Sequence, residues 1–145
     1  MGTVIETQKD TERLIENTHE SVKLTLDTGH MLFAKGDSKY ILQNYHERIL
    51  HVHCKDIRKQ VLEKSLKEDL SFRGAFLEGA FTVPGDGCID YQPLFNVLKN
   101  NNYSGWLVVE AEQDPAKANP LEYAKIGYNY LTDTLKKSEI EIYKN

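Results

Sequence analysis

The chain has 145 residues, 40% hydrophobic and 28% charged, which is enough for one modest hydrophobic core. The formal net charge of −4 and the mixing of basic with acidic residues argue against nucleic-acid binding. No apolar run approaches the roughly 20 residues of a membrane-spanning helix, and residues 1–20 are polar, so we expect a cytoplasmic protein without a membrane partner. Cys54 and Cys88 lack CxxC spacing, which is typical of a reducing compartment.

The first third of the chain is predicted to form a helix and then a strand–helix–strand unit. Thr7 is a suitable N-cap, and Leu14 and Ile15 give the short helix after it an apolar edge. Asp37 is expected to cap a second helix, in which apolar residues recur at helical spacing. The expected elements are a helix that ends before Asn17, a strand over 22–26, a turn over 27–30, a helix over about 38–46 and a strand over 49–53. The stretch 22–53 has the length of a right-handed crossover between parallel strands.

The region between residues 57 and 83 is predicted to be an insertion at the carboxyl end of a strand. Apolar spacing indicates a helix around 61–66 and a second short one that contains Phe72 and ends near Gly79. Such folds keep substrate-covering segments at this end of their strands, so the insertion is interpreted either as a lid or as a packed segment without a catalytic role. The turn at 84–87 contains Asp86, a candidate substrate contact; alternatively, the turn is only structural.

The last third of the chain is predicted to contain a helix, a strand and a long helix. The expected elements are a helix that begins after Asp90 and stops near Asn100, a strand over 106–109, a helix from Asn119 to about Lys136, and a polar, frayed tail over 138–145. Asn119 followed by Pro120 is typical of an N-cap and a first-turn proline. Trp106 is expected to anchor its strand in the helix-covered layer.

Three strands rich in Val, Leu and Ile that alternate with helices indicate an α/β fold in which helices cover a parallel sheet. Three strands cannot close a barrel, and a complete (β/α)8 barrel needs roughly 250 residues. We therefore expect about half of a TIM barrel, incomplete as given, over residues 1–137.

Side chains that commonly bind metal ions stand at the carboxyl ends of all three predicted strands. Asp27 follows the first strand, Glu110 follows the third, and His51 and His53 share one face of the second. In a parallel sheet these ends share one edge, so Asp27, His53 and Glu110 are predicted to converge on a divalent ion. Carboxylates with one imidazole suit Mn²⁺ or Co²⁺ better than a typical zinc site, with Mg²⁺ as an alternative. His51 lies one pleat deeper and is interpreted as a support for the ligands or a packing residue.

Further polar residues near these strand ends are candidates for the same site. Glu112 shares a face with Glu110 and is interpreted as its support, because Glu110 directly ends the apolar run. Lys55 and Asp56 follow the second strand, where a proton donor or acceptor would lie; the alternative is an ion pair with each other or with the insertion. The alternative for Asp27 is a helix or turn cap after its strand.

The chain contains the strings LDTGH (26–30), HVHCKD (51–56), FTVPGDGCID (81–90) and GWLVVEAEQDPAKANP (105–120). Together they resemble the C-terminal half of the myo-inosose-2 dehydratase family, in the xylose-isomerase-like TIM-barrel superfamily. The similarity runs from the first residues to about Leu135, and the last string is the most specific. It implies Asp27, His53 and Glu110 as metal ligands at the ends of the sixth, seventh and eighth barrel strands. It also implies a substrate contact by His30, which is thus a candidate catalytic residue beside Lys55 and Asp56; alternatively, His30 is only a turn residue.

The resemblance implies a hydro-lyase that removes water from 2-keto-myo-inositol, a polyol ketone, to give a trihydroxycyclohexane-1,2-dione in inositol catabolism. It points to Mn²⁺ or Co²⁺ and adds glutathione as a cofactor. The alternatives are a sugar epimerase or isomerase of the same superfamily, or a non-catalytic barrel fragment. The first half of the barrel is absent from this sequence, so the expected partner is that missing half, with a homo-oligomer as an alternative. An unpaired first strand is expected to make the isolated chain self-associate.

Overall fold

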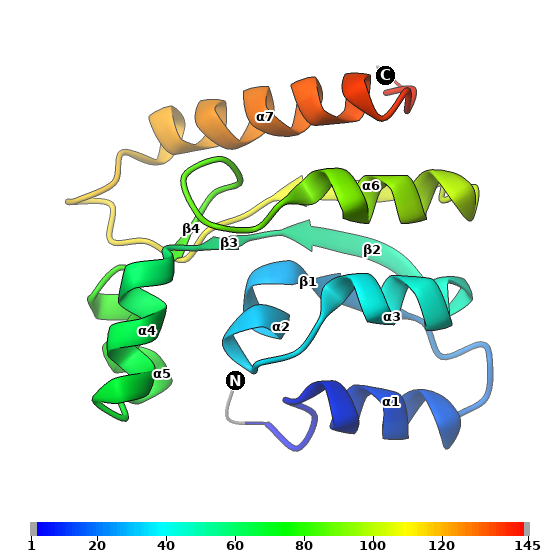
Figure 1. Ribbon diagram of the computed structural model, residues 1–145, viewed down its shortest axis with the longest axis horizontal. Helices are drawn as coiled ribbons and strands as arrows, with labels where there is room; N and C mark the ends of the chain where they lie inside the picture. Colours follow the sequence, from blue (N-terminus) through cyan, green and yellow to red (C-terminus); the bar gives the residue numbers. More distant parts are fainter. Residues whose placement is uncertain (1–2, 144–145) are drawn as a thin grey trace.

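The chain folds around a three-stranded parallel sheet with helices packed on one face (Figure 1). The computed structural model describes residues 3–143. The sheet consists of β1 (Leu24–Asp27), β2 (Ile49–Cys54) and β5 (Trp106–Val109), in the spatial order β1-β2-β5. The helices around it are α1 (Gln8–Glu16), α2 (Thr28–Phe33), α3 (Ser38–Tyr45), α6 (Tyr91–Asn100) and α7 (Pro120–Lys137). A 3-10 turn, His46–Arg48, leads into β2. The predicted partial (β/α) architecture is therefore confirmed.

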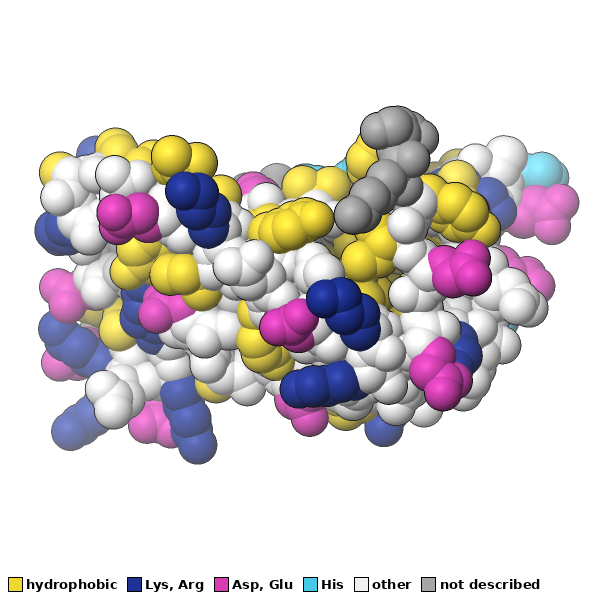
Figure 2. All heavy atoms as spheres, turned by 90° about the horizontal axis from the view of Figure 1, so that it is seen from above, with side chains coloured by type: hydrophobic (Ala, Val, Ile, Leu, Met, Phe, Trp, Pro, Cys, Tyr) yellow, Lys and Arg dark blue, Asp and Glu magenta, His cyan; other side chains and the backbone are white. Residues whose placement is uncertain are grey.

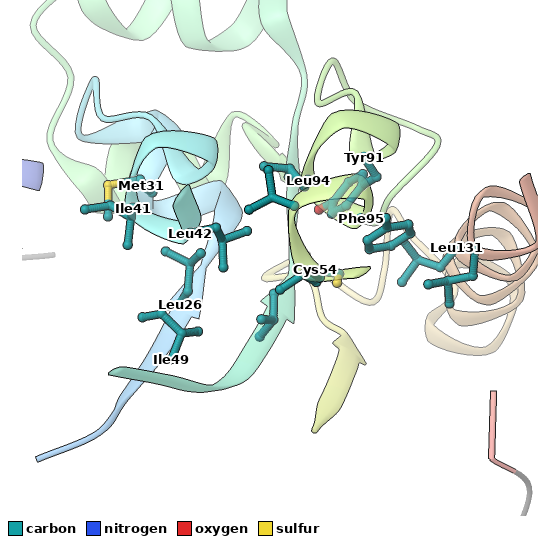
Figure 3. Close-up of a cluster of buried hydrophobic side chains, with 14 residues drawn as sticks. Leu26, Met31, Ile41, Leu42, Ile49, Cys54, Tyr91, Leu94, Phe95 and Leu131 are labelled. Carbon is teal, nitrogen blue, oxygen red and sulfur yellow. The ribbon is translucent and has the colours of Figure 1, made fainter. Parts of the chain in front are cut away.

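The main hydrophobic core lies between the sheet and helices α3, α6 and α7 (Figure 3). Leu26, Val52 and Cys54 point from the strands into this layer and are almost completely buried. The helices meet them with a second set of buried side chains: Ile41, Leu42, Leu94, Phe95, Leu98, Leu131 and Leu135. Because alternate residues of a strand point to opposite faces, burying Leu26 and Val52 directs Asp27 and His53 to the other face.

The opposite face of the sheet is open. Thr25 pairs with His51, and His51 pairs with Trp106, so these three side chains share that face. Trp106 is 67% exposed there. The prediction that Trp106 anchors its strand in the helix-covered layer is wrong, because it alternates with the core residues Leu107 and Val109. In a closed barrel this face would line the interior.

The insertion forms a small unit of its own. It comprises β3 (Asp56–Ile57), α4 (Lys59–Lys67), α5 (Phe72–Leu77) and β4 (Phe81–Thr82), and the two strands pair antiparallel. Its core contains Ile57, Ala75, Ala80 and Phe81. Phe33 of α2 packs against this cluster, which joins the insertion to the carboxyl edge of the main sheet.

Two local expectations differ from the structure. Residues 28–33, expected as part of a turn and its continuation, form helix α2, because the Asp27 side chain accepts the backbone N–H of His30 as an N-cap. The first part of the predicted tail is packed rather than frayed: Ser138 is buried and Ile140 contacts the core. Of the predicted tail, residues 144–145 lie outside the described residues. Among residues 3–143, none of the helices combines the length and hydrophobicity required to span a membrane.

Candidate active site

Asp27 lies at the junction between β1 and α2, and its two carboxylate oxygens make different contacts. Its Oδ1 accepts the His30 backbone N–H at 2.8 Å, which caps α2. Its Oδ2 lies 3.2 Å from Lys55 Nζ and 3.8 Å from His53 Nδ1. The two roles considered for Asp27, helix cap and site carboxylate, therefore occur together, one on each oxygen.

His53 and Glu110 complete a three-residue group with Asp27. The sheet register pairs Asp27 with His53, and Glu110 follows directly after β5. His53 Nδ1 lies 2.7 Å from Glu110 Oε2. One ligand atom from each of the three residues lies within 4.8 Å of the other two. Two carboxylate oxygens and an imidazole nitrogen at this spacing suit a divalent metal ion, so the predicted ligand set is brought together.

Lys55 is the buried cation of this group. Its side chain is 1% exposed, and its Nζ lies 3.2 Å from Asp27 Oδ2, 3.4 Å from Glu110 Oε1 and 3.3 Å from Glu112 Oε2. Burial opposes protonation of the amine, but the carboxylates of Asp27, Glu112 and Glu110 outweigh it and raise the pKa of Lys55 above its usual value. The Lys55 side chain is therefore an ammonium that points into the cluster.

His30 and Glu112 form the outer side of the same cluster. His30 Nε2 lies 3.0 Å from Glu112 Oε2 and 3.1 Å from Lys55 Nζ. The His30 ring makes T-shaped contacts with Phe72 and Phe81 of the insertion, with centroid distances of 5.7 and 5.4 Å. The insertion thus contacts a candidate site residue directly, and its role as a lid stays a prediction.

Asp56 lies apart from the cluster. It is buried, and its Oδ1 accepts the backbone N–H groups of Ile57, Cys88 and Ile89 at 2.7–2.9 Å. Burial raises the pKa of this carboxyl, opposed by these backbone donors. Its Oδ2 has no hydrogen-bond partner within residues 3–143. These contacts give Asp56 a structural role in holding the loop after β4, and they favour that role over the predicted proton transfer.

Asp86 is bound to an arginine that the sequence did not single out. Arg58 donates to Asp86 Oδ2 at 2.6 Å, and Thr82 donates to the same oxygen at 2.5 Å. Gln113 in turn donates to Thr82 Oγ1 at 3.3 Å, which links this pair to the loop that carries Glu110. A direct substrate contact by Asp86 stays a prediction.

His51 lies beside the cluster. Its ring centroid is 5.2 Å from that of His53, in an edge-to-face arrangement. His51 thus lies on the same sheet face as His53, and its supporting or packing role stays a prediction. Cys54, the residue after His53, points into the core, and burial raises the pKa of its thiol well above the usual range, so it is an inert core side chain.

Comparisons with known proteins define the class. The family model described as "Xylose isomerase-like TIM barrel" matches residues 1–134. The chain therefore belongs to the xylose isomerase-like TIM barrel family. Two solved structures share the fold: the IolI protein with a binding zinc atom (TM-score 0.65, 20% identity, 92% of this chain and 45% of that one) and the probable 3-DHS dehydratase AsbF of Bacillus anthracis (TM-score 0.63, 19% identity, 90% and 46%).

Curated relatives of higher identity narrow the similarity within this family. The chain is 52% identical over 134 residues to an inosose dehydratase of Clostridium beijerinckii and 48% identical over 136 residues to that of Lactiplantibacillus plantarum. It is also 50% identical over 131 residues to the rhizopine catabolism protein MocC of Rhizobium meliloti. These matches cover 90–93% of this chain but 40–45% of each relative. The chain thus spans about half the length of the curated relatives it matches.

Proposed function

We propose that this chain supplies the catalytic edge of a metal-dependent hydro-lyase that dehydrates an inosose, a cyclic polyol ketone, in inositol catabolism. The observation that carries the proposal is the convergence of Asp27, His53 and Glu110 around the buried Lys55 ammonium. Identities of 52% and 48% to two proteins named inosose dehydratase support this substrate class.

Asp27, His53 and Glu110 would hold the metal ion. Mn²⁺ or Co²⁺ suits this mixed set of two carboxylates and one imidazole, with Mg²⁺ as an alternative, and the zinc atom named for IolI supports a divalent ion. A bound divalent ion would act as a Lewis acid that polarises the ketone oxygen and acidifies the neighbouring C–H.

Two other side chains of the cluster, His30 and Lys55, would transfer the protons of the reaction. Dehydration removes a proton from the carbon next to the ketone and expels a hydroxyl from the following carbon, so it needs one base and one acid. His30 Nε2 and Lys55 Nζ are 3.1 Å apart and both contact Glu112 Oε2, so a proton can pass between them within one hydrogen-bonded group. We assign the acid and base functions to this pair. Phe72 and Phe81 pack against the His30 ring and shield part of it, and the side chain stays 30% exposed.

The site needs the rest of a barrel to be complete, and we propose the missing half as the partner, with a second copy of the chain as the alternative. Both outer strands, β1 and β5, have an edge without a neighbour among the described strands. A cavity of about 220 Å³ lies along β1, lined by residues that include Ile5, Leu14, Leu24, Leu26 and Asp27. Helix α7 also exposes Leu121 and Tyr128. Figure 2 shows a face of the molecule on which hydrophobic side chains lie among charged ones.

Metal binding and turnover test the proposal together. The sample is the barrel formed by this chain together with the proposed missing half, which we call the completed barrel. It should bind Mn²⁺ in calorimetry and form the dione from inosose, detected by the ultraviolet absorbance of the dione. Asp27→Asn should weaken Mn²⁺ binding by about tenfold or more. Asp37→Asn is the matched control, because Asp37 caps α3 in the way Asp27 caps α2 but lies outside the cluster.

Three outcomes would contradict the proposal. If turnover continues after exhaustive chelation, the reaction does not depend on a metal ion. If ketohexoses are offered and epimerised, while inosose gives no dione, the epimerase or isomerase alternative is favoured. No activity in the completed barrel would favour a non-catalytic fragment. The family resemblance implies glutathione as a cofactor. The same assays with and without added glutathione test whether turnover depends on it. A monodisperse, cooperatively melting monomer of the chain alone would remove the need for a partner.

A further inference from the structure

The backbone of Lys55 is held by two buried hydroxyl groups from other elements. Lys55 lies between β2 and β3, and its carbonyl oxygen accepts a hydrogen bond from Thr28 Oγ1 at 2.6 Å. The Lys55 N–H donates to the same Thr28 oxygen at 3.2 Å. Tyr91 OH donates to the Lys55 carbonyl at 2.9 Å and lies 2.8 Å from Thr28 Oγ1. We name Thr28 Oγ1 and Tyr91 OH the hydroxyl pair.

The hydroxyl pair lies inside the hydrophobic core. Thr28 and Tyr91 are 1% and 0% exposed, and the Tyr91 ring packs against Phe95 at a centroid distance of 5.7 Å. Burial raises the pKa of Tyr91 well above its usual value, so its hydroxyl stays a hydrogen-bond donor. A phenylalanine at position 91 would retain these ring contacts, so the core packing alone does not require the hydroxyl.

The whole segment 27–30 surrounds Lys55. Asp27 and His30 contact its Nζ, and Thr28 binds its backbone. Gly29 leaves room for its stem, since a Cβ at this position would lie 2.7 Å from Lys55 Cγ. Consecutive residues of the segment therefore fix the ammonium, the main chain and the methylene stem of one lysine.

We propose that Thr28 and Tyr91 are positioning residues for Lys55. By fixing its N–H and carbonyl, the hydroxyl pair sets the point from which the side chain extends, and so places Nζ within reach of His30 and the three carboxylates. Tyr91 begins helix α6, which otherwise packs in the core, so this contact connects the outer helix layer to the cluster. The inference rests on the proposed function only for its consequence in catalysis; the placement of Lys55 is independent of the reaction.

The first experiment measures the accessibility of Lys55 and needs no turnover. The completed barrel is acetylated with acetic anhydride, and the rate at each lysine is read by peptide mass spectrometry. Lys55 should react slowly in the wild type and about tenfold faster in Tyr91→Phe and Thr28→Val, because the local opening that exposes it becomes easier. Thr28→Ser retains the hydroxyl and should stay protected.

Tyr103→Phe is the matched control. Tyr103 OH also donates to backbone carbonyls of the sheet, those of Leu50 at 3.3 Å and Trp106 at 3.0 Å, but at the opposite end of the strands. It should lower the melting temperature less than Tyr91→Phe, because its hydrogen bonds are exposed, and it should leave Lys55 protected. If Tyr91→Phe leaves Lys55 protected, or if Tyr103→Phe exposes it equally, the positioning role is overturned.

Kinetics of the same variants then test the consequence. In the completed barrel, Tyr91→Phe and Thr28→Val should lower kcat by about 10- to 100-fold with little change in KM or Mn²⁺ affinity, whereas Thr28→Ser and Tyr103→Phe should keep kcat within about threefold of the wild type. A loss confined to KM, or equal losses in Tyr91→Phe and Tyr103→Phe, would contradict the role. If the wild type shows no turnover, the proposed function fails while the acetylation result still decides the placement of Lys55.

Discussion

Lys55 and Asp56 are neighbours in the chain, both are buried, and their surroundings differ completely. Lys55 lies among the side chains of Asp27, Glu110, Glu112 and His30 at the open edge of the sheet. Asp56 lies among backbone N–H groups of the loop 85–89. Consecutive residues in an extended chain point to opposite sides. The side chain of Lys55 therefore points into the candidate site, and that of Asp56 points away from it.

The difference shows how a buried charge reveals its role. A buried charge balanced by several other titratable side chains is a candidate for chemistry. A charge satisfied by main-chain donors fixes the path of a loop. The fit around Asp56 is close: a Cβ on Gly87 would lie 2.1 Å from Asp56 Oδ1. Under the proposed function Lys55 is the catalytic candidate of the pair, whereas the contacts of Asp56 hold the loop.

The largest effect is expected from Lys55→Met in the completed barrel. The substitution removes the ammonium but keeps an unbranched stem, so kcat should fall by about 10³-fold, within the range for loss of a proton-transfer group. Mn²⁺ binding by calorimetry should persist, because Asp27, His53 and Glu110 remain. A variant with near-normal kcat would show that Lys55 only balances charge.

Asp56→Ala should act on stability instead. It leaves the N–H groups of Ile57, Cys88 and Ile89 without their acceptor, which should lower the free energy of unfolding by about 3 kcal/mol in urea denaturation. Asp56→Asn is the control, because its amide oxygen can accept the same three bonds, and it should lose less than about 1 kcal/mol. If Asp56→Asn retains the fold but abolishes turnover, Asp56 belongs to the reaction after all.

The sequence predicted the main sheet and the composition of the cluster because both follow from local patterns. The strand 106–109 has the predicted bounds, and the polar residues that end the three strands converge because parallel strands share a carboxyl edge. The first strand begins at Leu24 and ends at Asp27, two residues and one residue later than predicted. Element boundaries depend on tertiary pairing, which a local pattern does not contain.

What the sequence did not reveal depends on contacts between distant residues. Strands β3 and β4 are two residues long, too short for a periodic signal, and pair across the whole insertion. Tyr91 is 36 residues from Lys55, and a tyrosine at the start of a helix has no feature that predicts this contact. Trp106 fits an apolar strand pattern on either face, and only the register assigns it to the open one. Thr28 alone had a nearby signal, because it lies between two predicted site residues.

A smaller effect is expected from Gly29→Ala. Its Cβ would press on the Lys55 stem at 2.7 Å, so the stem must shift, and we expect a loss of about 1–2 kcal/mol in unfolding free energy together with faster acetylation of Lys55. Gly74→Ala is the matched control: Gly74 lies in helix α5, and its Cβ would have only ordinary contacts, the nearest at 3.4 Å. This change should stabilise the chain by up to about 1 kcal/mol. Equal effects at both glycines would remove the steric argument.

The smallest effect concerns pH. Burial raises the folded-state pKa of Asp56 above its ordinary value of 3.8, so the folded chain holds this proton more tightly than the unfolded chain does. Its contribution to stability is therefore greatest below pH 3.8 and is lost as the pH rises through the folded-state pKa. The wild type should lose stability relative to Asp56→Asn over this rise, because the amide does not ionise. Urea denaturation of both proteins across the acidic range measures the difference; a difference of the opposite sign would mean that the backbone donors outweigh burial, so that the loop stabilises the carboxylate.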